Sequence, residues 1–326
     1  AIWTTYFLTL QEKGWVNKMS ATLNAYKGMT IRNIKIYMKD KTAILLSMLA
    51  QIIVLGLFVL FLRDNYVGSI KDGLGELQNL LSDSDIDKIV NGWMISGVIG
   101  TALVTVALNS LVVIVKDKED KINYDYTASP VKPHTVVLSY FTASVINTFV
   151  VSAILMTAGF VFLGISCDTT YSPIEILKMY GLVALGSISS ALILMVIATF
   201  FKKSSSLGSF GALVSAAIGF IIGAYVPVSQ FSDTVQTIVN LVPGSQIAGM
   251  MRSLLMKSAV ENAQSAIGSK AGAEFANQMN KLFAIKLNIF GSEVDFTFMM
   301  IYSIAAIVLF LAVNLIVYKF TSKTKE

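Results

Sequence analysis

Long apolar segments separated by polar stretches are the main pattern along this chain. Six of them contain no Asp, Glu, Lys, Arg or His, and they cover residues 43–62, 94–115, 135–165, 180–201, 207–228 and 297–318. A helix rises roughly 1.5 Å per residue, so each segment is long enough to cross about 30 Å of hydrocarbon. The pattern therefore predicts an all-α integral membrane protein with six transmembrane helices.

A further apolar stretch, residues 234–251, differs from these six because Pro243-Gly244 interrupts it. Proline removes a backbone donor and glycine lets the chain turn, so each half is too short to cross a bilayer. We expect a re-entrant pair of half-helices between the fifth and sixth spans, entering from the extracytoplasmic side. Broken segments persist at membrane depth where protein or a water-lined cavity satisfies their backbone, so this region is expected to border a translocation path.

The polar stretches predict the remaining elements. Residues 1–18 begin without Met and lack the basic start of a secretory signal, so we interpret them as an extension preceding a native start at Met19. Residues 19–42 place apolar side chains at helical spacing beside a basic face, which predicts a helix lying at the membrane interface; an ordinary cytoplasmic tail is the alternative. Residues 63–93 are acidic with a leucine-rich patch at 74, 77, 80 and 81, and are expected to form a solvated outer loop or a short cap. Within the outer region 229–296, residues 253–295 predict one or two amphipathic helices over the outer mouth.

Charge bias gives an orientation. Of the 25 Lys and Arg residues, 16 lie in the two termini and in the loops 116–134 and 202–206, while 9 are spread over the longer loops of the opposite side. The positive-inside rule then predicts that both termini are cytoplasmic. A seventh full span would separate the two basic tails, so the bias also favours the re-entrant interpretation.

Composition excludes several kinds of chemistry. The sequence is 55% hydrophobic and 14% charged, with one Cys and one His, so neither a disulfide nor a Cys/His metal site is expected. No nucleophile-base set indicates a membrane hydrolase, so we predict no catalytic residue and no enzyme activity in this chain. No Walker A pattern is present, so a nucleotide-driven process would need another chain. Spans without ionisable groups argue against a proton-driven transporter.

Four amides lie within the spans: Gln51, Asn109, Asn147 and Asn314. They are candidate pathway or interface groups, although hydrogen bonding between helices is the more usual role of such residues.

The loop at 116–134, KDKEDKINYDYTASPVKPH, is the most informative polar stretch. Charges of both signs are followed by two tyrosines and then by two prolines. A short helix of this kind is suited to docking into a groove on another protein. From the residues alone, a solvated inner loop is an equal alternative.

At this point the chain resembles an ABC-2 type transporter permease, the membrane subunit of bacterial ATP-binding cassette exporters in the drug-resistance and daunorubicin-exporter branch. The resemblance rests on Val115 to Tyr140, with its charged cluster and Ser-Pro-Val-Lys step, and on the Val-Pro-Val, Asn-x-x-Pro and arginine pattern at 226–252. The order of interfacial helix, six spans and outer hairpin is similar as well. Many members have a glycine soon after the charged cluster, whereas this chain has Lys121-Ile122-Asn123.

The resemblance implies a partner and two sets of site residues. A separate ATP-binding subunit, in two copies, would hold ATP and Mg while this chain binds no cofactor, and two permease copies would pair. The coupling residues implied are Lys116, Asp117, Lys118, Glu119, Asp120, Lys121, Tyr124, Tyr126, Pro130 and Lys132. The re-entrant or outer-gate residues implied are Pro227, Asn240, Pro243, Gly244 and Arg252.

The resulting hypothesis is an exporter of an amphipathic drug-like, peptide or lipid-like substrate in the bacterial cell membrane. An ATP-independent channel or membrane scaffold is the alternative. We expect membrane lipid but no nucleic acid as a further partner. The residues leave open the cargo, the direction of transport and whether the two permeases are identical.

Overall fold

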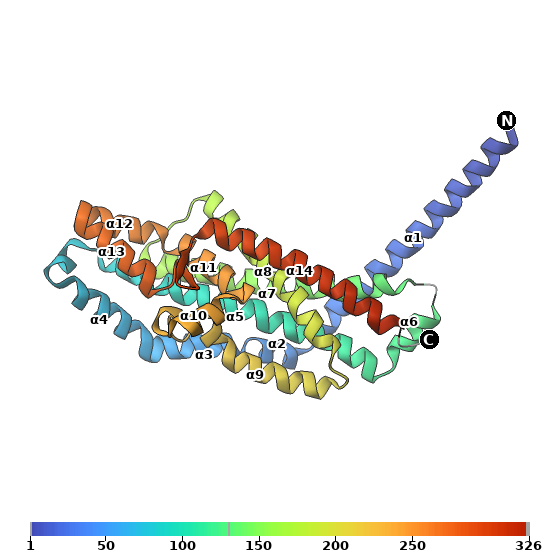
Figure 1. Cartoon of the computed structure of the whole chain (residues 1–326), viewed down its shortest axis with the longest axis horizontal. Helices are drawn as coiled ribbons and strands as arrows, with labels where there is room; N and C mark the ends of the chain where they lie inside the picture. Colours follow the sequence, from blue (N-terminus) through green and yellow to red (C-terminus); the bar gives the residue numbers. More distant parts are fainter. Residues whose placement is uncertain (1, 130, 324–326) are drawn as a thin grey trace.

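Six long apolar helices form an elongated bundle (Figure 1). The computed structural model describes residues 2–129 and 131–323. Within those residues, six helices are long and apolar enough to cross a membrane, and each contains most of one predicted span. The first membrane-length helix is composite and consists of α2 (Lys41–Ser47), α3 (Leu49–Leu57), a π-helical turn η1 (Phe58–Leu62) and α4 (Arg63–Leu74). The other five are α5 (Asp83–Glu119), α7 (Pro133–Cys167), α8 (Pro173–Thr199), α9 (Ser204–Ile222) and α14 (Phe296–Lys323).

Helix α5 is the centre of the bundle. Its most apolar 18-residue window is 89% buried, compared with 6% for α14, and α7, α8, α9 and α11 (Pro243–Leu255) all pack on it. Small residues on α5 permit this close packing. A Cβ on Gly97 would lie 2.9 Å from the backbone Cα of Ala224, so only glycine fits there. The outward face of α14 is instead left for lipid or another chain.

The predicted outer loop 63–93 is largely helical, and here the sequence interpretation was wrong. The first span continues without a break into α4, a short 3-10 helix η2 (Gly75–Leu80) follows, and α5 begins at Asp83, eleven residues before the predicted span. The alternating acids have a local role, because Ser82 caps the helix by accepting from the Asp85 amide, and acidic residues in a first turn favour the helix dipole. Lys71 bonds to Asp83 at 2.6 Å and joins α4 to α5.

The fifth span is shorter than its apolar run. Helix α9 ends at Ile222, and Gly223 turns the chain in the left-handed region with φ of 75°. The chain folds back so that the Tyr225 ring lies against Gly219, where a Cβ would be 2.3 Å from the ring carbons. Residues 223–227 therefore form a turn, and the span does not extend to 228 as predicted.

The connection from α9 to α14 is a compact lobe, which we call the outer lobe because the sequence predicts that it lies on the extracytoplasmic side. It contains η3 (Val228–Gln230), α10 (Asp233–Asn240), α11, α12 (Lys257–Ile267), α13 (Ser269–Leu282) and an antiparallel hairpin of β1 (Leu287–Ile289) and β2 (Ser292–Val294). The sequence predicted amphipathic helices here but not the hairpin. Its turn is made by Phe290 and Gly291, both at positive φ, and only the glycine is a usual sequence signal for that geometry.

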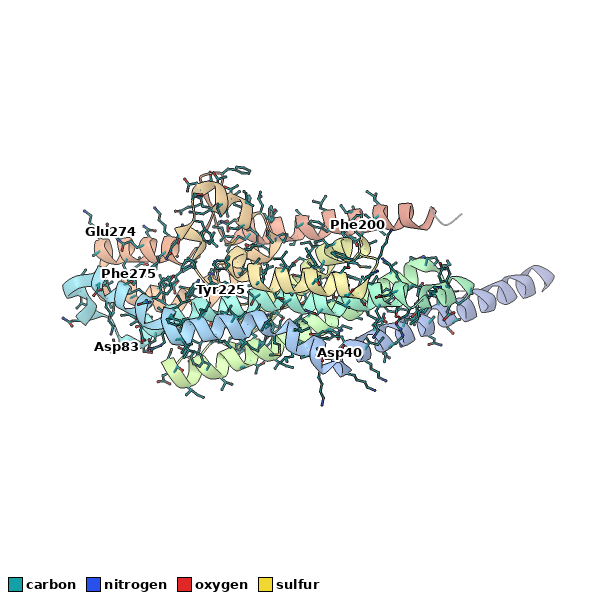
Figure 2. The ribbon with its side chains drawn as sticks, turned by 90° about the horizontal axis from the view of Figure 1, so that it is seen from below. Asp40, Asp83, Phe200, Tyr225, Glu274 and Phe275 are labelled. Carbon is teal, nitrogen blue, oxygen red and sulfur yellow. The ribbon has the colours of Figure 1, made fainter. Side chains whose placement is uncertain are left out.

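The two ends of the molecule differ. Helix α1 (Ile2–Lys39), the short helix α6 (Ile122–Ala128) and the end of α14 lie at one end, which we call the terminal end (Figure 1). Helices α4, α12 and α13 lie at the other, the distal end, where Figure 2 labels Asp83 and Phe275. Helix α1 is continuous across the predicted boundary at Met19, and its first part projects away from the bundle.

Candidate functional site

The terminal-end loop joins α5 to α7. Helix α5 ends at Glu119, Lys121 adopts a left-handed conformation with φ of 61°, and α6 follows. Helix α7 then begins with Pro133 at its first position, where a missing amide proton costs nothing. Left-handed φ favours glycine, so Lys121 occupies, at some backbone cost, a conformation that glycine would adopt freely. Pro130 lies outside the described residues.

Asp117 does not belong to the exposed surface of this loop. Only 2% exposed, it accepts from Arg32 Nη1 at 2.7 Å and Nη2 at 2.8 Å, and from the Tyr140 hydroxyl at 2.5 Å. These bonds join α1, α5 and α7, and the hydrogen bond with Asp117 raises the pKa of Arg32. The prediction that Asp117 faces a partner is therefore corrected, because its carboxylate is committed inside the chain. Arg32 was not singled out, and an 85-residue separation carries no periodic signal.

Two further predicted coupling residues connect the loop to neighbouring helices. Glu119 accepts from the Ser204 amide at 2.8 Å and its hydroxyl at 2.6 Å, at the start of α9. Lys118 donates to the Thr199 carbonyl at 3.1 Å, at the end of α8. Part of the charged cluster therefore forms hydrogen bonds within the chain that connect α5 to the segment between α8 and α9.

The rest of the predicted loop residues face outward or lie at its edge. Tyr126 is half-buried and packs toward α5 and α7. The remaining residues are exposed: Lys116, Asp120, Lys121, Tyr124 and Lys132.

The broken apolar stretch forms two short helices, as its proline predicts. Helix α10 ends at Asn240, and Pro243 is the first residue of α11. Asn240 donates to the Asn288 carbonyl at 2.9 Å and so connects the break to the hairpin. Ser245 donates to the Val239 carbonyl at 2.7 Å across the break. Pro243 and Gly244 are themselves buried, and Pro227 lies buried just before η3.

Arg252 is fully buried with no carboxylate partner among the described residues. It donates to the carbonyls of Ile222, Gly223 and Ala284 and to the Ser96 hydroxyl. The carbonyls at the C-terminal end of α9 carry the partial negative charge of the helix dipole. Arg252 therefore fastens α9, α5 and the segment before β1 to α11, and the sequence could flag this residue but not its acceptors.

The four span amides make packing contacts. Asn147 donates to Ser110 at 2.8 Å, Asn314 donates to the Leu192 carbonyl at 2.9 Å, and the Gln51 amide lies 3.0 Å from the Thr105 hydroxyl. Asn109 bonds to the Thr105 carbonyl within its own helix. Three of the four therefore act between helices. On the same helix as Asn147, the hydroxyls of Thr148 and Ser152 are buried and have no hydrogen-bond partner among the described residues.

A bundle with six membrane-length apolar helices defines a multi-pass membrane protein. Residues 2–129 and 131–323 contain no group of three potential metal ligands. Residues 76–319 match the family model of the ABC-2 family transporter proteins, and the chain belongs to this family. It is therefore a membrane transport component, the permease subunit of an ABC transporter, and membership of the family implies association with an ATP-binding subunit. Comparison with curated proteins gave no match, and comparison with solved structures gave none.

Proposed function

We propose that this permease exports an amphipathic drug-like, peptide or lipid-like substrate, powered by ATP-binding subunits that dock on the terminal-end loop. The observation that carries the proposal is the position of α6 at the end of the bundle, with an aromatic and charged surface and with both flanking helices fixed to the body (Figure 1). We define the docking surface as Asp120, Lys121, Tyr124 and Lys132, all of them exposed. Tyr124 is 62% exposed, and exposed tyrosines are favoured at the centre of protein interfaces.

A push on α6 has a physical route to the distal end. Asp117 fastens the end of α5 to α1 and α7, and Glu119 fastens it to α9. Helix α5 then runs 37 residues, roughly 55 Å, to the outer lobe, where α11 packs on it. We infer that α5 moves as a lever when nucleotide changes the partner.

We also propose that α10 lies re-entrant in the membrane beside the pathway. Its exposed side chains include Val235, Ile238 and Leu241, with Ile238 61% exposed, whereas α11 behind it is buried along nearly its whole length. An apolar outer face on one short helix and a buried second helix fit a hairpin that contacts lipid on one side and protein on the other.

The complete assembly in this proposal contains two permeases and two ATP-binding subunits in the bacterial cell membrane, with both permease termini cytoplasmic. ATP and Mg belong to the partner, and this chain contributes no catalytic group.

Co-purification tests the docking surface. The permease is expressed with an affinity tag in its native cell, and the amount of ATP-binding subunit that co-purifies per permease is measured for the parent and for the double variant Asp120→Lys with Tyr124→Ala. Asp72→Lys is the matched control, because Asp72 is also an exposed helix-end aspartate but lies on α4 at the distal end. We expect the double variant to lose at least tenfold of the bound partner and the control to retain it. Equal retention of the partner by the parent, the double variant and the control would contradict docking at α6. Cargo movement by the permease alone, without nucleotide, would support the channel alternative.

A further inference from the structure

A crevice lies between α4 and α13 at the distal end. Its volume is about 240 Å³, and the two walls come from segments about 200 residues apart in the chain. Its apolar lining consists of Ile70, Gly73, Leu74, Phe275, Met279 and Leu282. Figure 2 shows Phe275 at this end of the molecule, far from Asp40 at the start of the first span.

The lining defines the chemistry that the crevice accepts. Among the residues whose side chains the structure describes, no charged residue lines the crevice, and its two polar residues, Ser69 and Gln278, are exposed. The Ser69 hydroxyl already donates to the Asn65 carbonyl at 2.8 Å. An ionic group would lose its hydration inside without gaining a partner, so the interior suits an apolar group.

The volume of the crevice and the flexibility of its lining side chains narrow the class of ligand further. A cavity of about 150 Å³ holds a benzene ring, so this larger space admits a longer group. Isoleucine, leucine and especially methionine side chains can adapt to a flexible chain. An alkyl chain of about eight carbons fits both the volume and the lining.

The surroundings of the crevice favour the same ligand. Leu77 and Leu80 follow α4 directly and are 38% and 51% exposed, so an apolar lip adjoins the crevice. Arg63 is the first charged residue after the first apolar run, and Ser69 to Leu74 lie roughly 9 to 17 Å farther along the helix. An alkyl chain near the end of this helix could be buried from water in the crevice and against the exposed leucines that follow it.

We propose that the α4–α13 crevice is a binding site for an alkyl chain, belonging either to a membrane lipid or to a free amphiphile. The site is intrinsic to this chain and needs no ATP-binding partner. Its test is therefore independent of the docking test above.

The site is tested by photolabelling the full-length protein in lipid nanodiscs. The probe is an octanol that carries a diazirine on its chain, and adducts are located by peptide mass spectrometry. We expect saturable labelling of α4 and α13 that excess 1-octanol removes. Labelling spread over the lipid-facing helices, without saturation at these two, would overturn the proposal.

Two glycines on α4 provide a matched pair of variants. A Cβ at either Gly73 or Gly68 would meet no atom within 4 Å, and neither glycine has a positive φ, but only Gly73 lines the crevice. Gly73→Leu should reduce saturable labelling at least fivefold, and Gly68→Leu should leave it unchanged. Gln278→Trp closes the crevice from α13 and should repeat the loss if Gly73→Leu fails to fold. If Gly73→Leu and Gly68→Leu are labelled equally, there is no alkyl site here. If Gly73→Leu does not fold, equal labelling of Gln278→Trp and the parent protein refutes the site instead.

A second arm identifies the source of the chain. Nanodiscs containing a phospholipid with a diazirine at its acyl end are irradiated without octanol. Labelling of the crevice by this lipid supports a membrane lipid as ligand, and labelling by octanol alone supports a free amphiphile. Labelling by neither probe overturns the proposal.

Discussion

Replacing Arg32 and replacing Asp117 should lower the stability of the protein by different amounts, although the two residues form one ion pair. The Arg32 side chain is 34% exposed, whereas the Asp117 side chain is 3% exposed. In Arg32→Met, the carboxylate stays buried with the Tyr140 hydroxyl as its remaining donor among the bonds described. In Asp117→Asn, the guanidinium can still reach water and the Asn33 side chain, to which it bonds at 2.9 Å.

These geometries set the magnitudes. Leaving a buried charge without its counter-ion costs about 3 kcal/mol after allowance for the remaining Tyr140 bond. Replacing the carboxylate by an amide of the same shape costs about 1 kcal/mol, because the partly exposed arginine is hydrated. The double variant contains no buried charge at this position, so it should be more stable than Arg32→Met by about 1 to 2 kcal/mol.

Thermal unfolding in one detergent measures the order of stability. At about 2 °C for each kcal/mol, Arg32→Met should lower Tm by about 6 °C, and adding Asp117→Asn should recover about a third to two thirds of that loss. Lys35→Met is the control, since it removes an exposed cation from the same helix. A double variant that unfolds at or below the Tm of Arg32→Met would refute the argument that an uncompensated carboxylate is the cause.

Variants at three other residues test particular features by the same Tm measurement or by size-exclusion profile. Lys121→Gly should raise stability by about 0.5 to 1 kcal/mol by relieving the left-handed conformation, and an unchanged or lower Tm would count against strain there. Arg252→Met should aggregate on size exclusion, because three buried carbonyls lose their hydrogen-bond donor. Arg252→Lys should not restore the profile, since one ammonium cannot reach all three carbonyls. A monomeric profile for Arg252→Met would disprove the anchoring role. Thr148→Val should be neutral or stabilising by up to about 1 kcal/mol because the buried hydroxyl has no partner, and a marked loss would show that the hydroxyl makes an essential bond.

The coupling and gate residues show where sequence reasoning stopped. The charged cluster after Val115 drew attention to the right loop, but its charges divide into exposed side chains such as Asp120 and internal ones such as Asp117. That division depends on Arg32 and Tyr140, which reach Asp117 only after α1 and α7 pack against α5. The role of Arg252 likewise depends on the reversal of the chain at Gly223, which exposes the carbonyl ends of α9 to the guanidinium.

The sequence by itself determined the membrane class, the six apolar helices and the break at Pro243. Each of these follows from local properties, because the free energy of moving a segment into lipid is roughly a sum over its residues, and a proline in the middle of an apolar run interrupts a helix there. Only the tertiary structure decided that residues 63–93 are largely helical, that α9 ends at Ile222, that the outer lobe contains a hairpin, and that a crevice lies between α4 and α13. Polar helices, turns and ion pairs are selected by partners distant in the chain, and a linear pattern does not specify those partners.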